Sequence, residues 1–75
     1  MHPTLNASVA AEVRAELGRQ QITQRQLAAR LGWEPALLSR RLTGRTPLRI
    51  DDIERIAQVL GVPLSQLIPV EGASR

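Results

Sequence analysis

The sequence predicts an all-α fold, a compact domain of five short helices. Apolar residues recur at intervals of three and four, which is the spacing that places them on one face of a helix. Glycine and proline separate these stretches and leave room only for short loops. No stretch has the alternating pattern of a strand. The 75 residues are enough for one domain with a small core.

The first helix is expected from about Ala7 to Gln20, with Asn6 or Ser8 as its cap. Its apolar stripe consists of Val9, Ala10, Val13 and Leu17. The charged residues that lie off this stripe are expected to be solvated: Glu12, Arg14, Glu16 and Arg19.

The second and third helices are expected on either side of a tight turn. Thr23 and Gln26 have the spacing of a capping box, in which each side chain binds the backbone N–H of the other. Gly32 ends the second helix, because the turn requires a left-handed residue. Pro35 opens the third, where its missing N–H costs nothing, and Gly44 ends it. The inner faces carry Leu27, Ala28, Leu31, Leu38 and Leu42.

The fourth helix is expected to start at Asp51 and to stop at Gly61. Its first turn carries acids, which the helix dipole favours there: Asp51, Asp52 and Glu54. Its inner face carries Ile53, Ile56, Ala57 and Leu60. A last short helix covers Leu64 to Leu67 and is entered through Pro63. Residues 1–6 are expected to form a flexible N-terminus, residues 7–70 the domain, and residues 71–75 a flexible tail.

The positive charge is unevenly distributed. All ten basic residues are arginine, and the net charge is only +3. Between Arg25 and Arg49, however, there are six arginines and a single acid, Glu34. Such a patch indicates a polyanionic partner. Two short helices joined by a glycine turn and followed by a basic loop are what a helix-turn-helix needs to bind in the major groove of double-stranded DNA.

Other function classes lack the residues that they require. There is no cysteine, which suits a reducing cytosol and excludes thiolate metal sites. His2 is the only histidine, so the serines have no base beside them, and there is no glycine-rich phosphate loop or metal-ligand cluster. Neither a membrane span nor a signal peptide is apparent. We expect a cytoplasmic protein with no enzymatic activity, cofactor, small-molecule ligand or membrane partner.

From Thr23 to Leu67 the sequence resembles the helix-turn-helix domains of lambda-type repressors and Cro, the XRE family of bacterial transcription factors. The matching elements are Thr23-Gln24, Leu27-Ala28, Leu31-Gly32, Leu38, Gly44, Ile56-Ala57 and Leu60-Gly61-Val62. With the first helix included, the resemblance covers nearly the whole chain. It implies a lambda repressor-like DNA-binding domain.

The resemblance also implies roles for particular positions. Gln24 matches the family's clamp on the DNA backbone, where its amide and the helix N-terminus meet a phosphate. The positions that match base-contacting residues or their helpers are Glu34, Pro35, Ala36, Ser39, Arg40 and Arg41. The positions that match phosphate-contacting residues are Thr23, Gln24, Arg25, Thr43, Gly44, Arg45, Thr46 and Arg49.

The sequence departs from the family pattern in two places. Many relatives pair an arginine of the first helix with a glutamate near the end of the third, and these positions match Leu17 and Leu42 here. An apolar pair should preserve the fold, because a buried ion pair contributes little net stability. In addition, Pro35 and Ala36 cannot donate side-chain hydrogen bonds. Direct readout therefore rests mainly on Arg40, which could bind guanine or a phosphate.

Three side chains have alternative interpretations. Arg41 either helps to contact bases or lies along the first helix with its stem packed. Glu34 either accepts a hydrogen bond from a cytosine amino group or acts only through its charge at the helix N-terminus. Trp33, the only aromatic residue, is expected to pack in the turn rather than to stack on a base.

The expected function is that of a sequence-specific transcriptional regulator that binds an operator in the bacterial nucleoid, a repressor of the phage Cro or immunity-repressor type. The alternative is an antitoxin that binds a toxin and its own promoter. Family members commonly bind two half-sites as dimers. Leu64, Ile68 and Val70 either form a weak dimer contact or close the core over the fourth helix.

Overall fold

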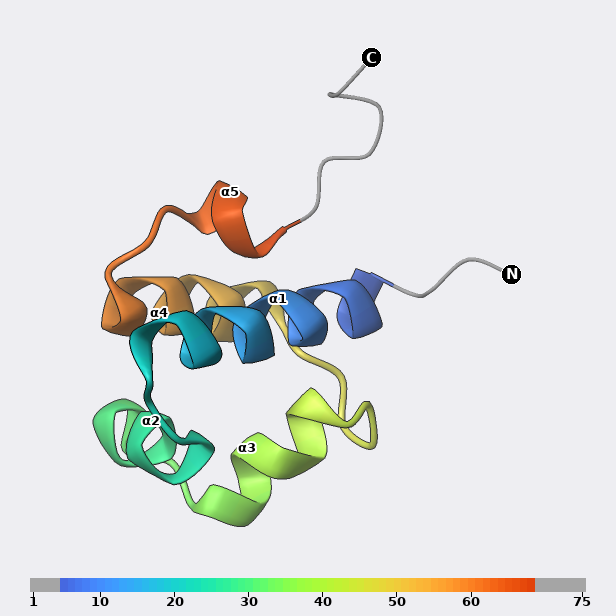
Figure 1. The fold of residues 1–75 in the computed structure, drawn as a ribbon. Coiled ribbons are helices and arrows are strands. Elements are labelled where there is room, and N and C mark those ends of the chain that lie inside the picture. The colour runs from blue at the N-terminus through green and yellow to red at the C-terminus, as the bar shows by residue number, and fades with distance from the viewer. Residues whose placement is uncertain (1–4, 69–75) are drawn as a thin grey trace.

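The computed structural model describes residues 5–68, which fold into five α-helices without a strand in this range. The helices are α1 (Leu5–Gln20), α2 (Gln24–Leu31), α3 (Pro35–Leu42), α4 (Ile50–Leu60) and α5 (Leu64–Leu67). In Figure 1, α1 and α4 cross the middle of the molecule, with α2 and α3 below them and α5 above. Helix α2 packs on α3 and α4, α3 packs on α1, and α5 packs on α1 and α4. The predicted all-α fold is confirmed.

Helix α1 begins at Leu5, two residues before the expected start. Asn6 and Ser8 therefore lie inside the helix, and the prediction that one of them caps it was wrong. The Asn6 Oδ1 instead accepts a hydrogen bond of 2.6 Å from the backbone N–H of Leu48. This bond ties the first turn of α1 to the loop before α4, and its partner lies too far along the chain for a local pattern to indicate it.

The start and end signals of α2 and α3 act as expected. The Thr23 hydroxyl accepts from the Gln26 N–H at 3.0 Å, and the Gln26 Oε1 accepts from the Thr23 N–H at 2.9 Å, so the capping box is confirmed. Gly32 has a φ of 76° and ends α2 in the left-handed region. Pro35 occupies the first position of α3, as predicted.

Helix α4 begins at Ile50, one residue before the expected start, and ends before Gly61. The Asp52 Oδ2 accepts a hydrogen bond of 2.9 Å from the Arg49 N–H, which satisfies one of the free donors at this end of the helix. The short helix α5 has the predicted bounds and follows Pro63.

The core lies between the helices and contains every residue that the sequence assigned to an inner face. Leu17 and Leu42, the proposed apolar substitutes for an ion pair, are both buried. The core also buries Leu48 from the loop before α4 and Leu67 from α5. The sequence did not single out Leu48, whose backbone N–H is bound by Asn6.

The prediction that Glu16 is solvated was wrong, because the residue is only 5% exposed. Its carboxylate accepts hydrogen bonds from Arg19 at 3.0 Å, from Gln20 at 2.8 Å and from Gln66 of α5 at 2.8 Å. The bond from Gln20, followed by that from Arg19, lowers the pKa of Glu16 below its usual value. The packing of α5 against α1 explains the burial of this carboxylate.

Residues 1–4 and 69–75 lie outside the described range, so the predicted flexible tail and the first residues of the predicted N-terminal segment are not covered. In the described range, no helix combines the length and apolar character that crossing a membrane requires.

Candidate nucleic-acid interface

Helices α2 and α3 pack on one another across the turn at residues 32–34 and form one end of the molecule (Figure 1). Leu27 and Leu31 of α2 and Leu38 of α3 are buried on their facing sides. The backbone N–H of Trp33 donates to the Ala28 carbonyl at 2.9 Å, which closes the turn. Because the inner side of α3 is held in this way, its opposite side is left open to solvent.

The open side of α3 carries most of the residues predicted to contact bases. The exposed members of that set are Glu34, Pro35, Ala36, Ser39 and Arg40. The Glu34 side chain makes no capping hydrogen bond, so any effect on the helix N-terminus is through its charge. Contact of these residues with bases stays a prediction.

Arg41 differs from the rest of that set, because its guanidinium is occupied within the domain. Its Nη1 lies 2.9 Å from the Asp52 Oδ2, and its side chain is 19% exposed. Its Cζ lies 4.9 Å from the centre of the Trp33 ring. The interpretation that Arg41 lies along the first helix was therefore wrong, since its partners come from the turn and from α4. These contacts argue against a base contact from Arg41, which stays a prediction.

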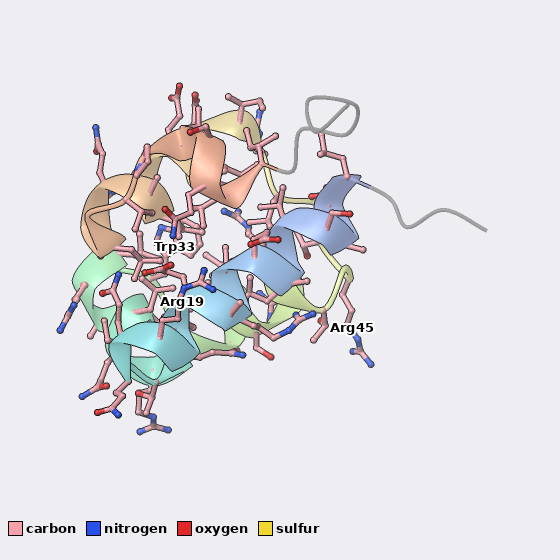
Figure 2. All side chains as sticks on the ribbon, turned by 45° about the horizontal axis from the view of Figure 1, so that its top comes forward. Arg19, Trp33 and Arg45 are labelled. Atoms are coloured by element: carbon pink, nitrogen blue, oxygen red, sulfur yellow. The ribbon has the colours of Figure 1, made fainter. Side chains whose placement is uncertain are left out.

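The basic loop, residues 43–49, folds back on the end of α3. The backbone N–H groups of Arg45 and Thr46 donate to the Arg40 carbonyl at 2.9 and 3.2 Å. The Thr43 hydroxyl donates to the Ser39 carbonyl at 2.9 Å, and Gly44 turns the chain with a φ of 87°. The side chains of Arg45 and Arg49 are exposed, and Figure 2 shows Arg45 projecting away from the helices. The loop is thus tied to α3 while its arginines are free to meet a ligand.

The predicted phosphate contacts at the start of α2 are also accessible. Thr23, Gln24 and Arg25 are all exposed. The first N–H groups of a helix have no partner within the helix and carry partial positive charge, which favours an anion at this end. The arrangement places one cationic edge at the N-terminus of α2 and another at the basic loop.

Two arginines hold the helices together, although Arg55 had no predicted role and Arg14 was predicted only to be solvated. The Arg55 Nη2 donates to the Leu31 carbonyl at 3.0 Å, and the Arg14 Nη1 donates to the Leu42 carbonyl at 3.0 Å. Each cation therefore satisfies a carbonyl at the C-terminal end of α2 or α3, where the helix dipole favours it. No local pattern indicates these contacts, because the partners lie on helices distant in sequence.

The C-terminal apolar residues pack inward in part. Leu64 and Ile68 are half-buried and lie against the core. This packing supports the interpretation that the segment closes the core over α4. Val70 lies outside the described residues, and the dimer contact stays a prediction.

The fold and the exposed face of α3 define a helix-turn-helix, a motif that docks its second helix in the major groove of DNA. The model of the family described as "Helix-turn-helix domain" matches residues 8–67. The chain therefore belongs to the helix-turn-helix domain family. Among proteins with curated functions, none matches the sequence significantly.

Two solved structures have the same fold. The clp gene regulator ClgR from C. glutamicum superposes with a TM-score of 0.81 at 23% sequence identity, over 88% of this chain and 86% of that chain. A hypothetical transcription factor, NHTF from Neisseria, superposes with a TM-score of 0.82 at 26% identity, over 91% of this chain and 78% of that chain.

Proposed function

We propose that this protein is a transcriptional regulator that recognises a specific sequence of double-stranded DNA through α3. The observation that carries the proposal is the position of Arg40, exposed on the open side of α3 and flanked by the basic loop. A guanidinium in this position can bind O6 and N7 of guanine together in the major groove. The named regulators of the same fold support a role in transcription.

The proposed complex has two cationic edges that hold the DNA backbone. Gln24 and Arg25 at the start of α2 meet one strand, and Arg45 and Arg49 of the basic loop meet the other, so that α3 is held in the groove between them. Phosphate contacts of this kind supply much of the affinity, while base contacts supply the specificity. Pro35 and Ala36 add apolar surface at the start of α3, where a thymine methyl group is the matching feature.

We further propose that the protein is a repressor of the phage Cro or immunity-repressor type and acts as a weak homodimer on its operator in the bacterial cytoplasm. The resemblance of the sequence to lambda-type repressors supports this finer assignment. A dimer would read two half-sites related by a two-fold axis and centred about one helical turn, or a multiple of it, apart. The role requires binding alone, without catalysis or a cofactor.

The test is a selection of bound sequences from random duplex DNA, repeated with R40A. We expect the wild-type protein to enrich a palindromic consensus, and R40A to enrich one that has lost preference at a base pair in each half-site. Enrichment of an asymmetric site would contradict the dimer, and failure to enrich any sequence would contradict the proposed function.

A further inference from the structure

Trp33, Arg41 and Asp52 form a cluster beside the proposed DNA-binding face, and we call it the Arg41 cluster. They come from the turn, from α3 and from α4. The Arg41 guanidinium lies over the Trp33 ring, with 4.9 Å between Cζ and the ring centre, and is paired with Asp52 at 2.9 Å. The side chains of Arg41 and Asp52 are only 19% and 13% exposed. The cluster is therefore shielded from most of the solvent that weakens ion pairs at a surface.

The cluster connects α3 to the end of the basic loop. The same oxygen of Asp52 that pairs with Arg41 also accepts the bond from the Arg49 N–H at 2.9 Å. Helices α3 and α4 have little backbone contact of their own, since α3 packs mainly on α1 and α2, and α4 on α2 and α5. The Arg41–Asp52 pair thus provides a direct side-chain link between the proposed recognition helix and Arg49.

The other side of the guanidinium is held by the turn. Trp33 is anchored by its backbone bond to α2, and its half-buried ring packs against the core. Contact with an indole on one side and a carboxylate on the other restricts the orientations that a guanidinium can adopt. The buried Nε–H of Arg41 has no hydrogen-bond partner among the described residues. The guanidinium is therefore mostly enclosed between the turn and α4.

We propose that Arg41 is a positioning residue for DNA recognition. Through Trp33 and Asp52 it sets the rotation of α3 about its axis, without touching DNA itself. Successive residues of a helix point about 100° apart, so an inward Arg41 directs Arg40 outward. The inference rests on the proposed DNA-binding function and assigns to Arg41 a role that differs from base contact.

Two substitutions test the inference from opposite sides of the pair. R41M keeps an unbranched stem but removes the charge, whereas D52N leaves Arg41 in place and removes its partner. We expect each to lower affinity for the selected operator about tenfold, as a displaced base contact would, and to change affinity for random duplex DNA little. The double variant should lose no more than either single variant, because both act on one contact. The two substitutions shift net charge in opposite directions, so a shared loss of selectivity cannot arise from net charge.

D51N is the matched control. Asp51 lies in the same first turn of α4 and is exposed, so D51N removes the same charge from the helix start and leaves the Arg41–Asp52 pair intact. We expect it to keep the wild-type selectivity. Trp33 is the only tryptophan, so its fluorescence reports on the cluster in the free protein. R41M and D52N should alter that emission, and D51N should not, at a temperature where melting curves show all variants to be folded.

The salt dependence of binding separates positioning from contact. If Arg41 positions α3, R41M keeps the wild-type slope of log affinity against log salt, because no phosphate contact is lost. If Arg41 touches DNA instead, R41M flattens the slope by about one unit, and D52N raises affinity for all sequences by releasing the guanidinium. Either result overturns the inference, as does wild-type selectivity in R41M and D52N. A wild-type protein that prefers no sequence would overturn the proposed function as well.

Discussion

Two adjacent arginines of α3 have opposite surroundings, although they are the same residue type. Arg40 is exposed, and its backbone carbonyl accepts the N–H groups of the basic loop. Arg41 is paired with Asp52 and covered by Trp33. Since both carry the same charge, their difference comes from the side of α3 on which each lies.

Replacing Arg40 with alanine should weaken binding to the operator by about 1–3 kcal/mol, because a bidentate contact with guanine is worth that much in discrimination. Preference should be lost at a single base pair in each half-site. Titration of the operator and of operators changed at each position measures both effects. An equal loss of affinity for operator and random DNA would show that Arg40 contacts only phosphate.

At the scale of the elements, α3 is held by a small number of buried side chains. Leu38 is fully buried between α2 and α3, and Leu42 is buried near the α3 C-terminus. The basic loop is tied to the same end of α3 by bonds to the Ser39 and Arg40 carbonyls. Apolar packing therefore holds α3 against its neighbouring helices, while hydrogen bonds to the Ser39 and Arg40 carbonyls hold the loop to its end.

Replacing Leu38 with alanine should lower the free energy of unfolding by about 2–5 kcal/mol, because it removes buried volume and leaves a cavity. Urea denaturation followed by circular dichroism measures the change. The control is L5A, since Leu5 is 55% exposed and its truncation should have a small effect. A Leu38 variant as stable as L5A would contradict the packing of α3 described here.

The exposed arginines of the basic loop lead us to expect a particular salt dependence of DNA binding. R45Q and R49Q should each flatten the slope of log affinity against log salt by about one unit, and should weaken binding to all sequences almost equally. Both side chains are exposed, and the bond from Arg49 to Asp52 uses its backbone, so the fold should not change.

Q24A is the neutral counterpart of these variants. Gln24 carries no charge, so its replacement should lower affinity and leave the slope nearly unchanged. Binding titrations at several salt concentrations measure all three variants. Wild-type slopes for R45Q and R49Q would mean that the basic loop does not lie on the DNA backbone.

At the scale of the whole molecule, Glu16 links the first helix of the described residues to the last. It accepts bonds from its own helix and from Gln66 of α5, and Gln20 also donates to the Leu60 carbonyl at the end of α4 at 2.8 Å. One carboxylate therefore links α1, α4 and α5 on the side opposite the proposed DNA-binding face. The stability of this side should depend on the charge of Glu16.

The lowered pKa of Glu16 predicts how stability depends on pH. Because the folded protein holds this proton less tightly than the unfolded chain, the contribution is complete above the ordinary pKa that Glu16 has in the unfolded chain, and it is lost as pH falls through the lower folded pKa. Thermal unfolding between neutral and acidic pH should show a smaller loss of stability for E16Q than for the wild type. The control is E54Q, because Glu54 is exposed. Equal pH profiles for E16Q and the wild type would contradict the role of Glu16.

The sequence by itself determined the five helices and most of the core, because their signals are local. The Thr23–Gln26 capping box, Gly32, Pro35 and the periodic apolar residues each act within a few positions of the chain. The same local pattern placed Arg40 on the open side of α3. The resemblance of the sequence to known regulators is confirmed at the level of the helix-turn-helix, whose family model matches residues 8–67.

The tertiary structure alone decided which polar side chains hold the helices together. The bond from Leu48 to Asn6 spans 42 positions, and the bond from Gln66 to Glu16 spans 50. The pairing of Arg41 with Asp52 likewise depends on how α4 lies beside the turn. A charged or amide side chain can be satisfied by water or by any suitable group that folding brings near, so its residue type and spacing do not identify its partner. Apolar burial follows the period of the helix, whereas these contacts exist only once the helices have packed.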